Sequence, residues 1–140
     1  MKILEILTEK RQIGTIGEDA AAKHLKKNKY RILRKNYVAL DYEIDIIAEN
    51  KDFLVFVEVK TRTVGKESDN EPRPASAVTP EKQRKIISTA NFFLGGRQQS
   101  KRIRFDIIEV YLNDKKTVQD LCHIESAFNY NTAHPHQFSK

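Results

Sequence analysis

Charged side chains interrupt two apolar segments at the centre of the sequence, residues 43–60, which read EIDIIAENKDFLVFVEVK. Asp45 lies in the first segment, and Glu58 and Lys60 lie in the second. Carboxylates with a nearby lysine can bind a divalent cation and stabilise the charge that develops at a phosphate during its transfer. These three residues are therefore the first candidates for a functional site.

The alternation of apolar and polar residues predicts two strands, at 42–49 and 53–61, joined by a short polar turn. If the turn places Glu49 opposite Leu54, the numbers of paired residues sum to about 103. Asp45 then lies opposite Glu58 on the same face of the hairpin, with Cβ atoms ~5 Å apart. A slip of one residue would place the two carboxylates on opposite faces.

Two carboxylates that face each other repel, so the arrangement requires a compensating positive charge. Lys60 supplies one, and a divalent cation supplies another; ligand sets made only of oxygen are typical of Mg²⁺ or Mn²⁺. The competing interpretation is an exposed polar face, where charged residues are usual. Ile47 and Phe56 share this face, however, so both faces of the hairpin are apolar, which indicates a covered position.

The segment 13–28 has the periodicity of a helix, and one acid lies on its apolar face. Glu18 shares that face with Gly14 and Leu25, so we expect it to point toward the sheet and to act as a further metal ligand. The alternative is an acid favoured by the helix dipole near the N-terminus. Gly14 and Gly17 are expected to let the helix approach the sheet closely.

The other segments follow from turn and capping signals. Thr79-Pro80 predicts the start of a helix that ends near Leu94, before two glycines. Further strands are expected at 30–39, 102–112 and 117–126, a loop at 62–79, and a flexible tail at 127–140. The order of helix, three strands, helix and one or two strands predicts a mixed sheet flanked by helices, in the α/β class. We expect a single domain over residues 1–126.

The chain has 140 residues, a formal net charge of +6 and one cysteine. Residues 41–60 are acidic, whereas the flanking residues 1–40 and 80–104 are strongly basic. A polyanion could bind to the basic flanks while the acidic centre holds a cation; alternatively, the basic helical faces are simply solvated. The lone Cys122 cannot form an internal disulfide, and neither a signal peptide nor a membrane span is apparent, so we expect a cytoplasmic protein.

The pattern Asp45…Glu58-Val59-Lys60 resembles the core motif of PD-(D/E)XK nucleases. More closely, the chain is similar to the YraN-like family of small bacterial proteins, which resemble Holliday-junction resolvases. The stretches that carry this resemblance occur in the family's order between about residues 14 and 112: GTIGEDAAAKHL, EIDIIAENKDFLVFVEVKTR, AVTPEKQRKI and RFDIIEV.

The resemblance implies a restriction-endonuclease-like αβββαβ core and a metal-dependent endonuclease acting on DNA, including branched DNA or repair intermediates. Asp45 and Glu58 would bind Mg²⁺ or Mn²⁺, Lys60 would be the catalytic lysine, and Glu18 would be the acid of the first helix. The resolvase relatives act as dimers, so a homodimer is a further expectation.

Other positions are implied with alternatives. Glu43 matches an accessory acid, but Tyr42 replaces the preceding glycine of the family and is expected to point away from Asp45. The candidates for contacts with phosphate groups are Arg62, Lys82 and Lys85, although solvated surface positions explain them equally well.

Asp106 also lies in a matching block, and we expect it to pair with Arg104 on one strand face. Two alternatives to a nuclease remain open. One is a nucleic-acid-binding module without catalysis, and the other is a protein whose acids only form salt bridges.

Overall fold

The computed structural model describes residues 2–65 and 78–135. Its elements follow the order expected from the sequence, with additions at both ends: α1 (Ile3–Lys27), β1 (Arg31–Ala39), β2 (Tyr42–Glu49), β3 (Phe53–Thr63), α3 (Pro80–Leu94), β4 (Arg102–Leu112), β5 (Val118–Phe128) and α4 (Tyr130–Ala133). None of the described helices has both the length and the apolar composition needed to cross a bilayer.

The five strands form one mixed sheet in the order β1-β2-β3-β4-β5. β3 and β4 are parallel, and the other neighbouring strands are antiparallel. Parallel neighbours need a crossover connection, and α3 lies on the one between β3 and β4. The α/β class and the expected αβββαβ order are therefore confirmed, and the fold is consistent with a restriction-endonuclease-like core.

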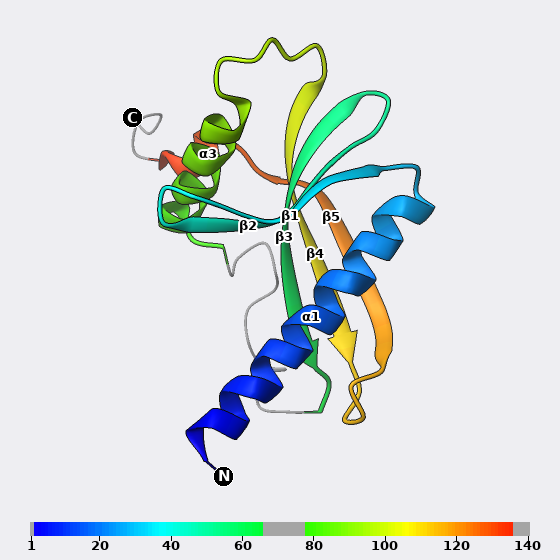
Figure 1. Ribbon diagram of the computed structural model, residues 1–140. Helices are drawn as coiled ribbons and strands as arrows, with labels where there is room; N and C mark the ends of the chain where they lie inside the picture. The colour runs from blue at the N-terminus through cyan, green and yellow to red at the C-terminus, as the bar shows by residue number, and fades with distance from the viewer. Residues whose placement is uncertain (1, 66–77, 136–140) are drawn as a thin grey trace.

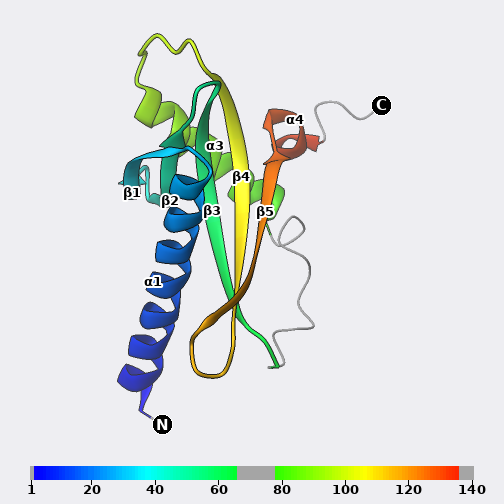
Figure 2. The ribbon, with the colours of Figure 1, turned by 90° about the vertical axis from the view of Figure 1, so that its right-hand side faces the viewer.

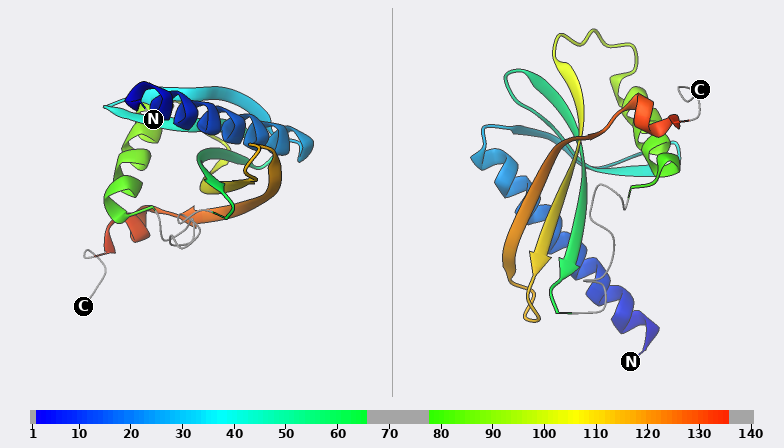
Figure 3. Two further views of the ribbon diagram at one scale, coloured as in Figure 1. Left: turned by 90° about the horizontal axis from the view of Figure 1, so that it is seen from below. Right: turned by 180° about the vertical axis from the view of Figure 1, so that it is seen from behind.

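The two long helices cover opposite faces of the sheet. Figures 1 and 2 show α1 lying diagonally across one face, and the view from behind in Figure 3 shows α3 on the other. Ala21 and Leu25 of α1 pack on Ile46 and Val57. On the other face, α3 packs on a cluster that includes Phe56. The sheet thus has a core on each side.

The β2–β3 hairpin is covered on both faces, as its sequence predicts. Residues 46–48 of β2 and 54–57 of β3 are all buried. A strand with one face in water would instead show an exposed residue at every second position. A charged side chain directly next to these buried residues therefore starts from a backbone position inside the protein and not from a polar surface.

The helix α1 begins ten residues earlier than the sequence pattern predicts. Its first turns extend past the edge of the sheet (Figure 3), where Ile3 and Leu4 are 76% and 74% exposed. Residues 3–12 contain two leucines, two glutamates and one each of lysine, arginine and glutamine, all of which favour helix without tertiary contacts. A prediction based on a face buried against the sheet therefore missed this part of the helix.

The ends of α3 match the prediction. The Thr79 hydroxyl accepts a hydrogen bond from the backbone N–H of Lys82, and Pro80 is the first helical residue. Gly95 closes the helix in the left-handed conformation, with φ 51°. Most of the loop expected over 62–79 lies outside the described residues.

The C-terminal segment is ordered further than expected. β5 continues to Phe128, which stacks on Phe105, and Asn129 and Thr132 cap the short helix α4 reciprocally. The Arg84 guanidinium donates to the backbone oxygen of Ala133 at 2.7 Å. Residues 127–133 therefore pack on the domain, and the expectation of a flexible tail from residue 127 was wrong for them.

Candidate active site

The register between β2 and β3 is the predicted one. Ile46 pairs with Val57 and Glu49 pairs with Leu54, so the paired numbers sum to 103. The ladder stops at Ile46, although β2 continues to pair with β1. One residue further, the Asp45 Oδ2 atom accepts a hydrogen bond from the Val59 backbone N–H at 2.8 Å. The aspartate side chain thus takes over the hydrogen bonding of β3 where the two strands separate.

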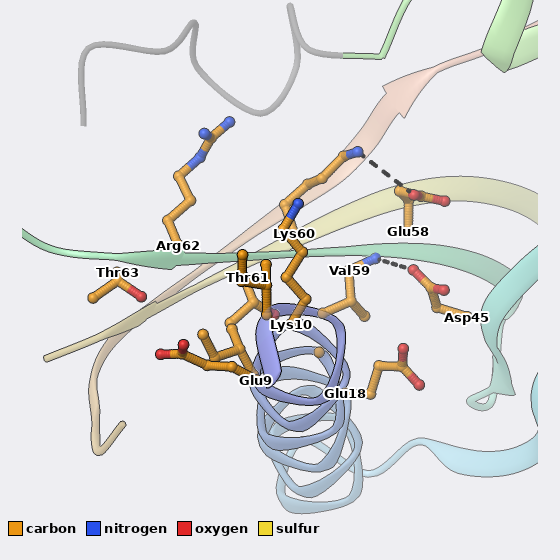
Figure 4. A pocket seen from close by; sticks show the side chains of 13 residues that line it. Glu9, Lys10, Glu18, Asp45, Glu58, Val59, Lys60, Thr61, Arg62 and Thr63 are labelled. Atoms are coloured by element: carbon orange, nitrogen blue, oxygen red, sulfur yellow. Dashed lines mark hydrogen bonds and ion pairs between the residues drawn. The ribbon is translucent and has the colours of Figure 1, made fainter. Parts of the chain in front are cut away.

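Asp45, Glu58 and Lys60 come together at this separation point (Figure 4). The Lys60 Nζ atom lies 3.8 Å from Glu58 Oε1, and the two side chains are only 24% and 14% exposed. The three residues line the same cavity. The charge in the hairpin is therefore largely withdrawn from water.

Burial and repulsion make this pair of carboxylates reluctant to ionise. Burial raises the pKa of Asp45, the neighbouring Glu58 raises it further, and the Val59 N–H opposes the shift only in part. Burial also raises the pKa of Glu58, against the opposing charges of Lys60 and Lys82. A further cation beside the two groups would favour their ionised forms.

Glu18 approaches the site from α1, on the other side of β3 from the Glu58 side chain (Figure 4). Its Oε1 atom accepts a hydrogen bond from Asn36 Nδ2 at 2.7 Å, so β1 holds this carboxylate. The expected orientation toward the site is present in part: Glu18 lines the cavity and raises the pKa of Asp45.

A close contact fixes the position of this helix. A Cβ atom at Gly17 would lie 1.7 Å from the Thr61 Oγ1 atom, so α1 rests directly on β3 at this residue. A Cβ atom at Gly14 would meet nothing within 4 Å. The expectation of close packing is therefore correct for Gly17 and wrong for Gly14.

The site opens into a groove of about 540 Å³ between α1 and the end of β3. One wall is the first half of α1, including Ile6, Lys10 and Ile13, and the other is the stretch 58–63 of β3. Because the carboxylates lie at the inner end of this groove, a ligand in it would reach them from the open side.

The donor atoms suit a hard divalent cation. Mg²⁺ is commonly held by one or two carboxylates together with waters and substrate phosphate oxygens, and Asp45 with Glu58 provides such a pair. Within residues 2–65 and 78–135, no group of three or more acidic, histidine or cysteine side chains is arranged to hold a metal ion. Glu18 is bound to Asn36 and does not complete a three-carboxylate cage.

The position of Tyr42 differs from the expectation. Its phenol was expected to point away from the site, yet burial raises its pKa, and it lies close enough to Glu58 and Asp45 for their charges to raise the pKa further. Strict alternation fails because β2 leaves β3 and follows β1, so that Ile44 and Ile47 pack in the same core cluster. Glu43 is exposed and adds negative charge near both carboxylates.

The three basic candidates have different surroundings. Arg62 is 11% exposed, and its Nε atom donates to Glu109 at 2.8 Å, so the protein itself binds this guanidinium. Lys82 is exposed and close enough to favour the ionised form of Glu58. Lys85, one turn further along α3, lies 3.8 Å from Glu81. Of the two lysines at the start of α3, Lys82 is therefore the one that lies near the site carboxylates.

Two residues around the site escaped the sequence analysis. Glu109 is buried and binds Arg62, and Asn36 binds Glu18. An acid between the apolar residues Ile108 and Val110 was a usable signal for Glu109. Asn36 gave none, because its contact depends on the approach of α1 to β1.

The fold and the site define an α/β protein with a mixed five-stranded sheet, whose carboxylate pair and lysine meet where two central strands part. The chain belongs to the family described as "Uncharacterised protein family UPF0102", whose model matches residues 17–110. This is the YraN-like family that the four sequence blocks indicated. The matched region contains every residue proposed for the site.

Relatives of this family cover most of the chain. A UPF0102 protein of Caldanaerobacter subterraneus is 45% identical over 121 residues, which is 85% of this chain and 96% of the relative. A UPF0102 protein of Clostridium acetobutylicum is 42% identical over 119 residues, 84% of this chain and 94% of the relative. A more distant one, from Flavobacterium johnsoniae, is 34% identical over 126 residues, 87% and 98% of the two chains.

Proposed function

We propose that this protein is a metal-dependent endonuclease that hydrolyses phosphodiester bonds in DNA. The observation that carries the proposal is the meeting of Asp45, Glu58 and Lys60 at the inner end of an open groove. Carboxylates whose pKa values are raised by burial and by each other, in a cleft, are characteristic of functional sites. Lys60 and Lys82 favour the ionised form of Glu58, yet the pKa values of both carboxyl groups stay raised.

Each residue has a distinct role in this proposal. Asp45 and Glu58 would hold Mg²⁺ or Mn²⁺, which supplies Lewis acidity and an activated water for hydrolysis. The Val59 N–H orients the Asp45 carboxylate, and the Tyr42 phenol lies near Glu58. The Lys60 ammonium stabilises negative charge that develops at the phosphate.

The surrounding residues position the substrate. Lys82 and Lys85 at the start of α3 would bind phosphates of the DNA backbone, which fixes its position without reading its sequence. Arg62 acts through its ion pair with Glu109, which holds the end of β3. Branched DNA and repair intermediates are the substrates that the family resemblance favours.

A cleavage assay tests the proposal. Labelled duplex, flap and four-way-junction DNA are incubated with Mg²⁺, Mn²⁺ or EDTA and with wild-type protein, Asp45→Asn or Lys60→Ala. Lys51→Ala is the matched control, because Lys51 is an exposed lysine in the turn between β2 and β3. We expect metal-dependent cleavage that falls at least about 100-fold in both site variants, since Asp45→Asn weakens the metal site and Lys60→Ala removes a positive charge that stabilises the transition state.

A second candidate function is a DNA-binding module without catalysis. The hydrogen bond between Glu18 and Asn36 favours it, because this acid is already bound within the protein. DNA binding that decreases steeply with salt, with no cleavage and no change in Asp45→Asn, would support this alternative and contradict the nuclease.

A further inference from the structure

Two histidines face each other where α1 meets β5, away from the carboxylate site. The His24 Nε2 atom lies 3.1 Å from His123 Nδ1. Their ring centroids are 5.2 Å apart. His24 is partly exposed on the helix, and His123 is mostly buried on the strand. Neither residue lines the groove, so the pair is a second cluster of metal-ligating side chains.

The buried carboxylate of Asp106 orients His123. The His123 Nε2 atom lies 2.7 Å from Asp106 Oδ2. Burial alone would raise the pKa of Asp106, but hydrogen bonds from His123, Arg104 and the Ser126 N–H lower it. An ionised carboxylate only accepts, so the Nε2 atom of His123 carries a proton, and in the neutral ring the lone pair on Nδ1 points toward His24. Metal-binding histidines usually have such a carboxylate behind them.

The distances suit a shared ion. Two imidazole nitrogens about 2.0–2.1 Å from a tetrahedral Zn²⁺ lie about 3.3 Å apart, and their ring centroids are about 5.3 Å apart. The observed separations of 3.1 Å and 5.2 Å differ from these by only tenths of an ångström. Once the proton between the rings leaves, an ion can take its place with little movement of either side chain.

We propose that His24 and His123 together bind one divalent transition-metal ion, with Zn²⁺ as the ordinary occupant and water at the remaining positions. Imidazole ligands suit zinc, copper and nickel, whereas Mg²⁺ prefers oxygen. The two sites of the protein therefore select different metals. With two protein ligands rather than the three or four of permanent zinc sites, the ion binds reversibly.

Local groups both favour and oppose the ion. The pKa of His24 is lowered by burial, by His123 and by Lys27, and a metal ligand must likewise be a neutral imidazole. The Lys27 charge also repels a cation. The Asn28 Nδ2 atom, 3.4 Å from His24 Nδ1, must turn away when that nitrogen carries the proton.

A bound ion would join α1 to the edge strand of the sheet. His24 lies six residues after Glu18 on the same helix, a rise of about 9 Å. The ion would therefore hold the helix that carries Glu18 at a point distant from the groove, in addition to the contact of Gly17 with Thr61.

Calorimetric titration of untagged protein with Zn²⁺, in an excess of Mg²⁺, tests this site. We expect one equivalent to bind, and His24→Gln to weaken the affinity at least about 10-fold. His134→Gln is the matched control, since His134 is a partly exposed histidine directly after α4 whose ring hydrogen-bonds locally to Tyr130. His24→Ala serves as a second variant, and circular dichroism without metal verifies that both are folded.

Electron paramagnetic resonance of bound Cu²⁺ gives a readout that a structural role alone would not change. Hyperfine coupling to two imidazoles is expected in the wild type and to one in His24→Gln. Equal Zn²⁺ affinity in wild type and His24→Gln, absence of binding, or loss only in His134→Gln would each overturn the proposal.

Discussion

Buried acids in this protein fall into two electrostatic classes. Asp106 receives hydrogen bonds from Arg104 and His123, which lower its pKa despite burial. Asp45 and Glu58 are also withdrawn from water, yet their pKa values are raised. The chain thus neutralises a structural acid with protein partners and leaves the acids of the groove short of positive charge. That difference is the strongest physical reason to place a cation at Asp45.

Replacing Asp45 by asparagine is expected to stabilise the metal-free protein. Between about pH 4, where a free aspartate ionises, and the raised pKa of Asp45, the folded state holds a proton that the unfolded state has lost. The contribution of this group to stability therefore falls as pH rises through that window. Asp45→Asn removes this penalty, and we expect the free energy of unfolding to rise by at least about 1 kcal/mol at the alkaline end of the window.

Thermal unfolding in EDTA at about pH 4.5 and about pH 8.5 measures this effect. The gain in Tm of Asp45→Asn over the wild type should be larger at the higher pH. An equal gain in Tm at both pH values would show that the pKa of Asp45 is not raised in the folded protein.

Removing Asp106 should have the opposite effect. In Asp106→Ala the buried Arg104 guanidinium loses its carboxylate, and the loss of one member of a buried ion pair costs about 3–5 kcal/mol. Urea unfolding at neutral pH measures the difference in free energy. Asp114→Ala is the control, because Asp114 is exposed in the turn after β4 and should change stability by less than about 0.5 kcal/mol.

At the scale of the elements, local signals predicted most of what the structure shows. The hairpin register followed from alternation and turn length, and the start and end of α3 followed from Thr79, Pro80 and Gly95. The first ten residues of α1 and the helix α4 were missed, because neither has a long apolar face against the sheet. The reorientation of Tyr42 was missed because the departure of β2 from β3 is a tertiary feature.

The position of α1 depends on the missing side chain of Gly17. Gly17→Ala would place a methyl group against the Thr61 side chain, so α1 must shift from β3, and we expect a loss of about 1–3 kcal/mol. Thermal unfolding measures the loss. Thr61→Gly should restore part of the stability in the double variant.

Gly14→Ala is the matched control on the same helix. A Cβ atom there meets nothing within 4 Å, and alanine favours helix over glycine by about 0.5–1 kcal/mol, so this variant should be more stable than the wild type. A loss of stability in Gly14→Ala equal to that in Gly17→Ala would contradict the assigned contact.

At the scale of the molecule, contacts between residues far apart in the sequence join α1 to β5 and β3 to β4. His24 and His123 are 99 residues apart, and Arg62 and Glu109 are 47 apart. No local pattern links such pairs, which is why the sequence indicated the central carboxylates but not the residues that hold the strands and helices around them. The expected homodimer stays a prediction, which size-exclusion chromatography of untagged protein tests.

The short helix α4 is expected to contribute to the stability of the whole domain. A chain that ends after Asn129 loses the Thr132 hydroxyl that donates to Gln83 and the Ala133 carbonyl that binds Arg84. Each lost hydrogen bond is worth about 0.5–1.5 kcal/mol. Denaturant unfolding should show a lower midpoint, whereas a chain that ends after Pro135 keeps both contacts and serves as control.

The parallel pairing of β3 with β4 determines when the groove can form during synthesis. Phe53 pairs with Arg102 and Thr63 pairs with Leu112, a constant separation of 49 residues. Residues 58–63, which bear Glu58 and Lys60, lie beyond the end of the β2 ladder and have β4 as their backbone partner in the sheet. On the ribosome these residues therefore stay without that partner until the chain has grown past Leu112. The carboxylates and the lysine are translated early but take up their arrangement late.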